Sequence, residues 1–486
     1  MRNEILLLII AFLPLLGAFL ISVSGRLKIV RDFFITSIPF AFLITFMAFF
    51  DQLITTEKSN LFFEIIPGLE LFFSLDSLGL IFLGLISLLW PIATIYSIGY
   101  LKKNEEKNQT RFHSFFAFSI SGAVCVALSG NLLTLFIAYE VLTLSTYPLV
   151  AHKDNEKSRN GSRTYLTVLL LTSIGIFLPA IIWIYQITGT LTFTQGGIFS
   201  NATVDESVLI ALILMIIFGV GKAAVMPFHK WLPAAMVAPT PVSALLHAVA
   251  VVKAGVFSIA KIFIFIFGVD LIANINLIDW IFGISAATII IASLIALRQN
   301  NLKRLLAYST ISQLSYVIFG VLILAPLSIV GALLHIISHA FGKITLFFAA
   351  GSIYSMSKKT QVSELRGIGR LMPWTMGSFS IAALSMIGVP PLAGFLSKWY
   401  FLLGAWQAEH YLAMAVIIVS TLLNTAYFFP ILYVAWFCKP EKNSNFGEAP
   451  LSIVLSLVFT ALLTASLFVW VDFPLEQIFL VTGKPS

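Results

Sequence analysis

The chain has 486 residues, of which 59% are hydrophobic and only 10% are charged, and its mean hydropathy is +0.98. This composition excludes a soluble globular protein and predicts an all-α polytopic membrane protein. The net charge of +7 is then better explained by membrane topology than by binding to nucleic acid.

The sequence carries no signature of a cofactor or metal site. Its two cysteines, Cys125 and Cys438, are about 310 positions apart, and no CxxC or Cys/His spacing indicates an iron–sulfur or metal centre. No glycine-rich phosphate loop follows a strand. We therefore expect no cofactor and no electron transfer within this chain.

Apolar runs of about 20 residues, separated by polar, proline or glycine breaks, predict fourteen membrane spans. The expected spans are residues 4–23, 32–50, 76–100, 112–128, 132–150, 164–185, 207–227, 241–268, 277–297, 304–324, 328–353, 374–404, 411–437 and 450–471. The first run is too long for a signal peptide and lacks a clear cleavage site, so we expect it to remain as a span. The long loop at residues 51–75 is expected to contain short structure.

The distribution of basic residues predicts how these spans are oriented across the membrane. Of the 29 basic residues, 21 lie in the odd-numbered loops, whereas the even-numbered loops and both tails hold only Arg2, Lys58 and Lys484. Because lysine and arginine are enriched on the cytoplasmic side, both termini are expected on the outer side of a bacterial inner membrane. The remaining five lie within spans: Lys222, Lys253, Lys261, Lys343 and Lys398.

Residues 218–257 combine costly charges with helix breakers. An apolar helix carries Lys222, Pro227 is the first of four prolines that interrupt it, and His247 and Lys253 follow on the next helix. A charge at the bilayer centre costs about 2.5–3.5 kcal/mol on insertion scales, and such residues mark ion or proton routes. Broken helices are tolerated where the freed backbone is buried or lines a cavity. This stretch is therefore predicted to act in transport, with His247 lining a channel.

Glu140 is the one carboxylate predicted to lie in the middle of a span, and Lys222 is its expected partner. A mobile carboxylate that approaches Lys222 favours proton uptake, and one that withdraws favours proton release, so the pair can drive a pump. The alternatives are a Glu140 that only bonds a neighbouring helix and a Lys222 that snorkels. Lys261 lies toward the outer end of its span and is interpreted as snorkelling.

His335, His339 and Lys343 are spaced i, i+4, i+8, which predicts one polar stripe about 12 Å long on a helix. Histidines at this spacing can relay protons through water. Zinc binding by the H-x-x-x-H pair is the alternative, but no third ligand is within sequence reach. The stripe is therefore interpreted as part of a proton path, with His335 lining it.

Lys398 follows a second helix break, at Pro390, Pro391 and Gly394. Interrupted helices in corresponding places indicate an inverted-repeat transporter. Spans 4–8 and 9–13 are the predicted repeats, with helices 7 and 12 broken. The expected division is residues 1–111 for helices 1–3, 112–268 for the first repeat, 269–438 for the second, and 439–486 for helix 14.

Five segments carry a resemblance to a known family, and they are FIAYEVLTL, GKAAVMPFHKWLPAAMVAPTPVSALLHAVAVVKAG, NLKRLLAYSTISQLSY, LLHIISHAFGKITLFF and GVPPLAGFLSKWYF. Over nearly its whole length the chain resembles the antiporter-like proton-translocating subunits shared by respiratory complex I and the Mrp-type multisubunit cation/proton antiporters. The resemblance implies transport roles for Glu140, Lys222, Lys253, His339, Lys343 and Lys398. Asn301 departs from the aspartate that is usual there, which puts a charge partner for Lys303 or Arg304 in doubt.

A lysine at position 398 resembles both the D-type Mrp subunit and two of the complex I subunits, whereas the VKAGVF segment resembles the Mrp type more. We therefore expect a subunit of a monovalent cation/proton antiporter that moves protons and Na+ or K+ with other membrane subunits in the lipid bilayer. The alternatives are a proton-pumping subunit of complex I, a subunit of a related proton-pumping hydrogenase, and a scaffold that has lost transport. The chain ends after the fourteenth span, so no long lateral helix is expected. The ionisable residues are predicted to lie on one hydrated line through both repeats.

Overall fold

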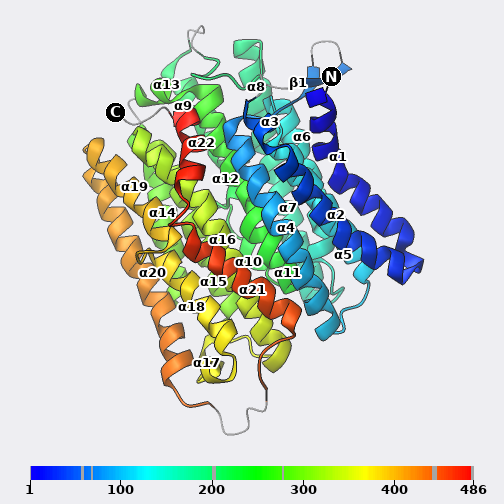
Figure 1. Ribbon diagram of the computed structural model, residues 1–486. Coiled ribbons are helices and arrows are strands. Elements are labelled where there is room, and N and C mark those ends of the chain that lie inside the picture. Colours follow the sequence, from blue (N-terminus) through cyan, green and yellow to red (C-terminus); the bar gives the residue numbers. More distant parts are fainter. Residues whose placement is uncertain are drawn as a thin grey trace. The chain divides into compact units, whose positions relative to one another are not determined.

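The computed structural model describes residues 2–55, 60–66, 69–199, 204–275, 278–440 and 446–482, and most of them are helical (Figure 1). In this described part, nine helical segments are long and apolar enough to cross a membrane. They are α1 (Arg2–Val23), α2 (Lys28–Ala48), α4 (Ser77–Lys103), the continuous run of α7 (Glu156–Thr172), η2 (Ser173–Phe177) and α8 (Leu178–Thr188), α6 (Leu132–Val150), α14 (Ile278–Leu297), α15 (Leu302–Leu322), α16 (Pro326–Ser357) and α20 (Tyr411–Phe437).

The prediction of a multi-pass helical membrane protein is confirmed, whereas the count of fourteen spans stays a prediction. The other predicted spans correspond to shorter, more polar or interrupted helices. These are α5 (Gln109–Ala127), α9 (Glu206–Gly219), the run of α11 (Thr240–Val242), η4 (Ser243–Ala250), α12 (Val251–Ile262) and η5 (Phe263–Phe267), the pair α18 (Pro373–Ile387) and α19 (Ala393–Gln407), and α21 (Leu451–Ser466).

Packing divides the chain into two compact units. Unit 1 comprises Met1–Pro91, Asn108–Ala238 and Ala250–Gly283. In it α1 packs on α2 and α5, α5 on α6, and α6 on α7, while α12 packs against the short 3-10 turn η3 (Gly221–Ala223). The predicted division into four parts follows the expected repeats of helices and not the packing of the chain, and it stays a prediction.

Unit 1 also holds a β-hairpin inside the loop for which short structure was predicted, and that prediction is confirmed. A short helix, α3 (Phe50–Thr55), precedes antiparallel strands β1 (Asn60–Ile66) and β2 (Leu69–Ser74). The rings of Phe62 and Phe72 stack across the strands with centroids 4.3 Å apart. Asn131 Nδ2 donates to Glu70 O at 2.9 Å, which fastens the hairpin to the start of α6.

Unit 2 comprises Ile92–Lys107, Pro239–Val249 and Ile284–Ser486, and α16 lies at its core. This helix contacts α15, α18, α19, α21 and α22 (Asp472–Thr482). In Figure 1, α21 and α22 are the red segments at the end of the described chain. The separate helix α22 was not predicted, because its start, with Asp472 and Pro474, is too polar to continue the preceding apolar span.

The two predicted helix breaks are present, but one begins earlier than expected. α9 ends at Gly219, upstream of Pro227, so that Lys222 lies within the break, on η3. The chain turns sharply at Ala224, where φ is 55°. The second break falls at the predicted prolines, because α18 ends at Ile387 and α19 begins at Ala393.

The close approach of α12 to η3 yields a testable consequence. A Cβ at Gly255 would meet the backbone of Ala223 and Lys222, whereas a Cβ at Gly283, on α14, has open space around it. We expect Gly255→Ala to lower the free energy of unfolding by roughly 1–3 kcal/mol through overpacking, and Gly283→Ala to leave it unchanged or raise it slightly. Thermal unfolding of the detergent-solubilised protein checks both, and equal Tm values for the two variants would contradict the expectation.

Candidate functional site

Lys222 is held in unit 1 by one turn of α6. Its side chain is fully buried. Nζ donates to Tyr139 O at 2.7 Å and to Thr143 Oγ1, and it lies 3.1 Å from the centroid of the Tyr139 ring. The Lys222 backbone N–H donates to Tyr139 Oη at 2.9 Å. Because Tyr139 and Thr143 are i, i+4 on a helix, they face Lys222 together.

Glu140 lies between Tyr139 and Thr143 on α6, but it does not bond Lys222 directly. Among the described residues, both Glu140 carboxylate oxygens are buried and accept no hydrogen bond, and the Lys222 ammonium donates to Tyr139 and Thr143 instead. The two groups therefore do not form an ion pair in this structure. Their alternating contact during transport stays a prediction.

Lys253 is fully buried on α12, whose neighbours include α5, α6 and η3. Gly255, two positions later, is what permits that helix to approach the backbone of Lys222 and Ala223. His247 belongs to the preceding π-helical segment η4, but its side chain lies outside the described part of the structure. The structure thus brings Lys253 and Lys222 onto neighbouring elements of unit 1.

Lys261 does not snorkel, so the interpretation made from its position in the sequence is wrong. Its side chain is 0% exposed, and Nζ forms an ion pair with Asp76 Oδ2 at 2.9 Å and donates to Ser129 O at 2.7 Å. Sequence position alone placed it near the end of a span, but packing by Phe193 and Phe257 closes it off from solvent. Lys261 is a buried cation with a fixed counter-charge.

The histidine stripe and Lys343 lie on α16 in unit 2, where all three side chains are buried. The His335 and His339 rings have centroids 5.8 Å apart, and His335 Nδ1 bonds Ser397 Oγ at 2.9 Å. Lys343 Nζ donates to Ser309 Oγ at 2.7 Å and to Leu306 O at 3.3 Å, both on α15.

Lys398 uses the second helix break directly. Its Nζ donates to Ile387 O, at the end of α18, at 2.7 Å, and to Thr421 Oγ1 of α20 at 3.1 Å. The last carbonyls of a helix lack an intrahelical donor, so the break at Pro390–Pro391 supplies an acceptor for the ammonium. Gly394 permits the tight return of the chain, because a Cβ there would collide with Ser385 O.

Lys222, Lys343 and Lys398 therefore share one arrangement, in which each ammonium donates to one backbone carbonyl and one hydroxyl. The sequence identified the lysines but not these neutral partners, which are the carbonyls of Tyr139, Leu306 and Ile387 and the hydroxyls of Thr143, Ser309 and Thr421. The only signal for them was hydroxyl spacing, such as the four-residue step between Tyr139 and Thr143. Asp76 was also missed, because it stands at the edge of a span.

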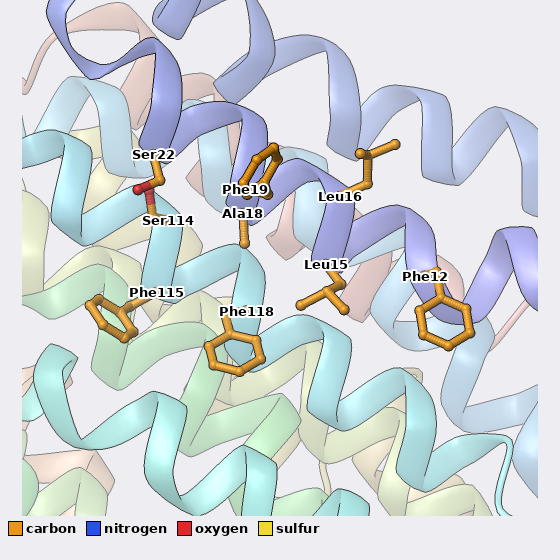
Figure 2. A pocket seen from close by; sticks show the side chains of 9 residues that line it. All are labelled: Phe12, Leu15, Leu16, Ala18, Phe19, Ser22, Ser114, Phe115 and Phe118. Atoms are coloured by element: carbon orange, nitrogen blue, oxygen red, sulfur yellow. The ribbon is translucent and has the colours of Figure 1, made fainter.

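Two further features of the described residues bear on the kind of site. No group of three or more histidine, cysteine, aspartate or glutamate side chains in that part could hold a metal ion. A groove of about 630 Å³ lies between α1 and α5, lined by apolar side chains with Ser22 and Ser114 (Figure 2). No titratable group lines it, so the groove is separate from the buried lysines.

Comparison with known proteins agrees with this geometry. The family model described as "NADH:quinone oxidoreductase/Mrp antiporter, TM" matches residues 129–424, more than half of the chain. The chain belongs to this family. It is 33% identical to an NADH-quinone oxidoreductase subunit N of Desulforudis audaxviator, covering 74% of this chain and 71% of that protein.

A second relative comes from the antiporter branch. The chain is 30% identical to the D subunit of a Na(+)/H(+) antiporter of Alkalihalophilus pseudofirmus, covering 78% of this chain and 76% of that protein. A chain of the Mrp complex from Dietzia sp. superposes with a TM-score of 0.87 at 21% identity, covering 99% of this chain and 97% of that one. The likeness to the Mrp chain establishes the shared fold.

The Lys261–Asp76 ion pair leads to a testable prediction about stability. Asp76→Asn keeps an acceptor for the Gly79 N–H, which bonds Asp76 Oδ1 at 2.7 Å, but removes the counter-charge of Lys261. Because an uncompensated buried charge remains, we expect a loss of about 3 kcal/mol in the free energy of unfolding. The double variant Asp76→Asn/Lys261→Met should recover most of it, and a single variant with wild-type Tm would refute the pairing.

Proposed function

We propose that the chain is the proton-translocating, D-like subunit of a multisubunit monovalent cation/proton antiporter. The observation that carries the proposal is that buried Lys222, Lys343 and Lys398 are solvated by carbonyls and hydroxyls and not by fixed counter-ions. A buried ammonium held only by neutral groups has no counter-charge that would keep it protonated. Such a lysine can take up and release protons, whereas ion-paired Lys261 is held charged.

The proton path is proposed to use Glu140, Lys222 and Lys253 in unit 1, and His335, His339, Lys343 and Lys398 in unit 2. Movement of Glu140 toward Lys222 favours proton uptake by that lysine, and its withdrawal favours release. Within unit 2, protonation of one lysine disfavours protonation of the other through like-charge repulsion, so that occupancy alternates. The continuity of the line between the two units stays a prediction, as does the role of His247.

Matching features in the two predicted repeats support their inverted relation. Asn131 caps α6 by accepting from Thr134 N, and Asn301 caps α15 by accepting from Arg304 N. Each unit has one helix break beside a buried lysine, the arrangement by which inverted-repeat transporters build central sites.

The proposal includes partners and location. A subunit of this kind works with other membrane subunits of a hetero-oligomeric complex, and the Mrp assembly that contains the superposed chain is such a complex. We place the protein in a bacterial inner membrane with both termini outside, because 21 of 29 basic residues fall in the odd-numbered loops. Na+ or K+ is the proposed coupling ion.

Membership of a proton-pumping NADH:quinone oxidoreductase is the second candidate. It is favoured by the 33% identity to a subunit N of such an enzyme. In that case the chain moves protons by the same buried lysines, while redox chemistry belongs to other subunits.

The first test removes the proposed proton carriers. We expect Lys222→Ala and Lys398→Ala to abolish proton flux in vesicles that contain the whole complex, while the subunit remains assembled. Lys230→Ala is the matched control, because Lys230 is exposed in the loop after the first break. Full flux in Lys222→Ala, or equal loss in Lys230→Ala, would overturn the assignment.

The second test separates the two candidate assemblies. The purified native complex in vesicles is supplied either with a Na+ or K+ gradient or with NADH and a quinone, and internal pH is followed with a fluorescent dye. For the antiporter, the cation gradient alone should drive proton movement. Proton movement with NADH and quinone, and none with either cation, would instead establish the oxidoreductase.

A further inference from the structure

A continuous run of hydrogen bonds joins two of the buried lysines in unit 2. From Lys343 Nζ it passes to Ser309 Oγ at 2.7 Å, and from Ser309 Oγ to Tyr427 Oη at 2.8 Å. Tyr427 Oη lies 2.6 Å from the side-chain amide of Asn424, and that amide lies 3.2 Å from Lys398 Nζ. Every side chain in this run is at least nine-tenths buried.

The orientation of the Asn424 amide follows from its neighbours. All four neighbours are matched when the amide oxygen faces the two donors, Lys398 Nζ at 3.2 Å and Gln313 Nε2 at 2.9 Å. Its nitrogen then donates to Ser420 O at 3.2 Å and to Tyr427 Oη at 2.6 Å. Tyr427 accepts from Asn424, so its own proton is left to be donated to Ser309 Oγ.

The run is built by one face of α20 against α15. Ser420, Asn424 and Tyr427 fall at i, i+4 and i+7 on α20, so they point the same way. Ser309 and Gln313 are i, i+4 on α15 and meet them. We infer that Asn424 and Tyr427 are positioning residues that couple the protonation states of Lys343 and Lys398, an inference that rests on the proposed function.

The coupling depends on the charge of Lys398 and does not involve transfer of a proton along the run. A charged Lys398 fixes the Asn424 oxygen toward itself, and this choice sets the direction of the Tyr427 and Ser309 hydroxyls as far as Lys343. Asn424 cannot pass a proton along the run, because an amide offers a donor and an acceptor on different atoms. A neutral Lys398 binds the amide oxygen more weakly, so the amide can turn and the hydroxyl bonds as far as Lys343 can then reverse.

Other titratable groups face the two lysines from their neighbours. In the described part of unit 2, neither ammonium forms an ion pair, and α18 and α21 contain no charged side chain. The carboxylates of α22, Asp472 and Glu476, are exposed. The Tyr316 ring centroid lies 5.9 Å from Lys398 Nζ, and His335 packs against Tyr316 and His339. Tyr427 bonds Ser309, which in turn bonds Lys343.

The test measures proton flux against pH in vesicles that contain the whole complex. Asn424→Leu removes the acceptor that stabilises the Lys398 ammonium, and Tyr427→Phe removes only a hydroxyl. We expect both to keep transport but to move the pH of half-maximal flux downward, by about one unit for Asn424→Leu, the size of one hydrogen bond to a charged group. Tyr433→Phe is the matched control, because Tyr433 is an exposed tyrosine of the same helix.

The double variant Asn424→Leu/Tyr427→Phe should shift the profile no further than Asn424→Leu alone, because the two residues act in series. Additive shifts, or a Tyr427→Phe profile identical to that of Tyr433→Phe, would overturn the inference. If the complex with Asn424→Leu fails to assemble, the pH profile of Tyr427→Phe still tests the inference. If Lys398→Ala transports normally, the proposed function fails, whereas loss of transport in Lys398→Ala with an unmoved Tyr427→Phe profile removes only the coupling.

Discussion

The burial of lysine ammonium groups is the constraint on which the rest of this structure depends. Removing an unpaired charge from water costs several kcal/mol even after the protein relaxes. In this chain, Lys222, Lys343 and Lys398 offset part of that cost with a backbone carbonyl and a hydroxyl each. Neutral acceptors of this kind solvate a cation without supplying a counter-charge, which suits the proton exchange proposed for these lysines.

The irregular features of the helices supply those acceptors and bring them close. The early end of α9 at Gly219 places Lys222 on a 3-10 turn within reach of α6, and the end of α18 at Ile387 exposes a carbonyl to Lys398. Gly255 and Gly394 then permit backbone approach that any side chain would prevent. Helix breaks and glycines thus serve the same purpose as the hydroxyls, which is to bring polar atoms to buried cations.

The contrast with Lys261 separates a structural cation from the proposed carriers. Lys261 is as buried as Lys222, yet it forms an ion pair with Asp76 at 2.9 Å. A counter-ion in direct contact stabilises the charged form strongly, so such a lysine holds elements together and does not exchange protons readily. Burial alone therefore does not identify a proton carrier in this protein, and the identity of the partner decides it.

The sequence by itself determined the membrane class, the helix breaks near the prolines and the identity of the buried lysines, because charge and proline are so costly in lipid that few placements are possible. It determined the family through the segments around Lys222 and Lys398. Only the tertiary structure decided that Lys261 is paired with Asp76, that α9 ends before Lys222, and that Ser309, Tyr427 and Asn424 join Lys343 to Lys398. Serine, asparagine and tyrosine cost far less than a charged residue inside a membrane, so their spacing is only a weak sign of which ones face a buried charge. How the helices pack decides that choice.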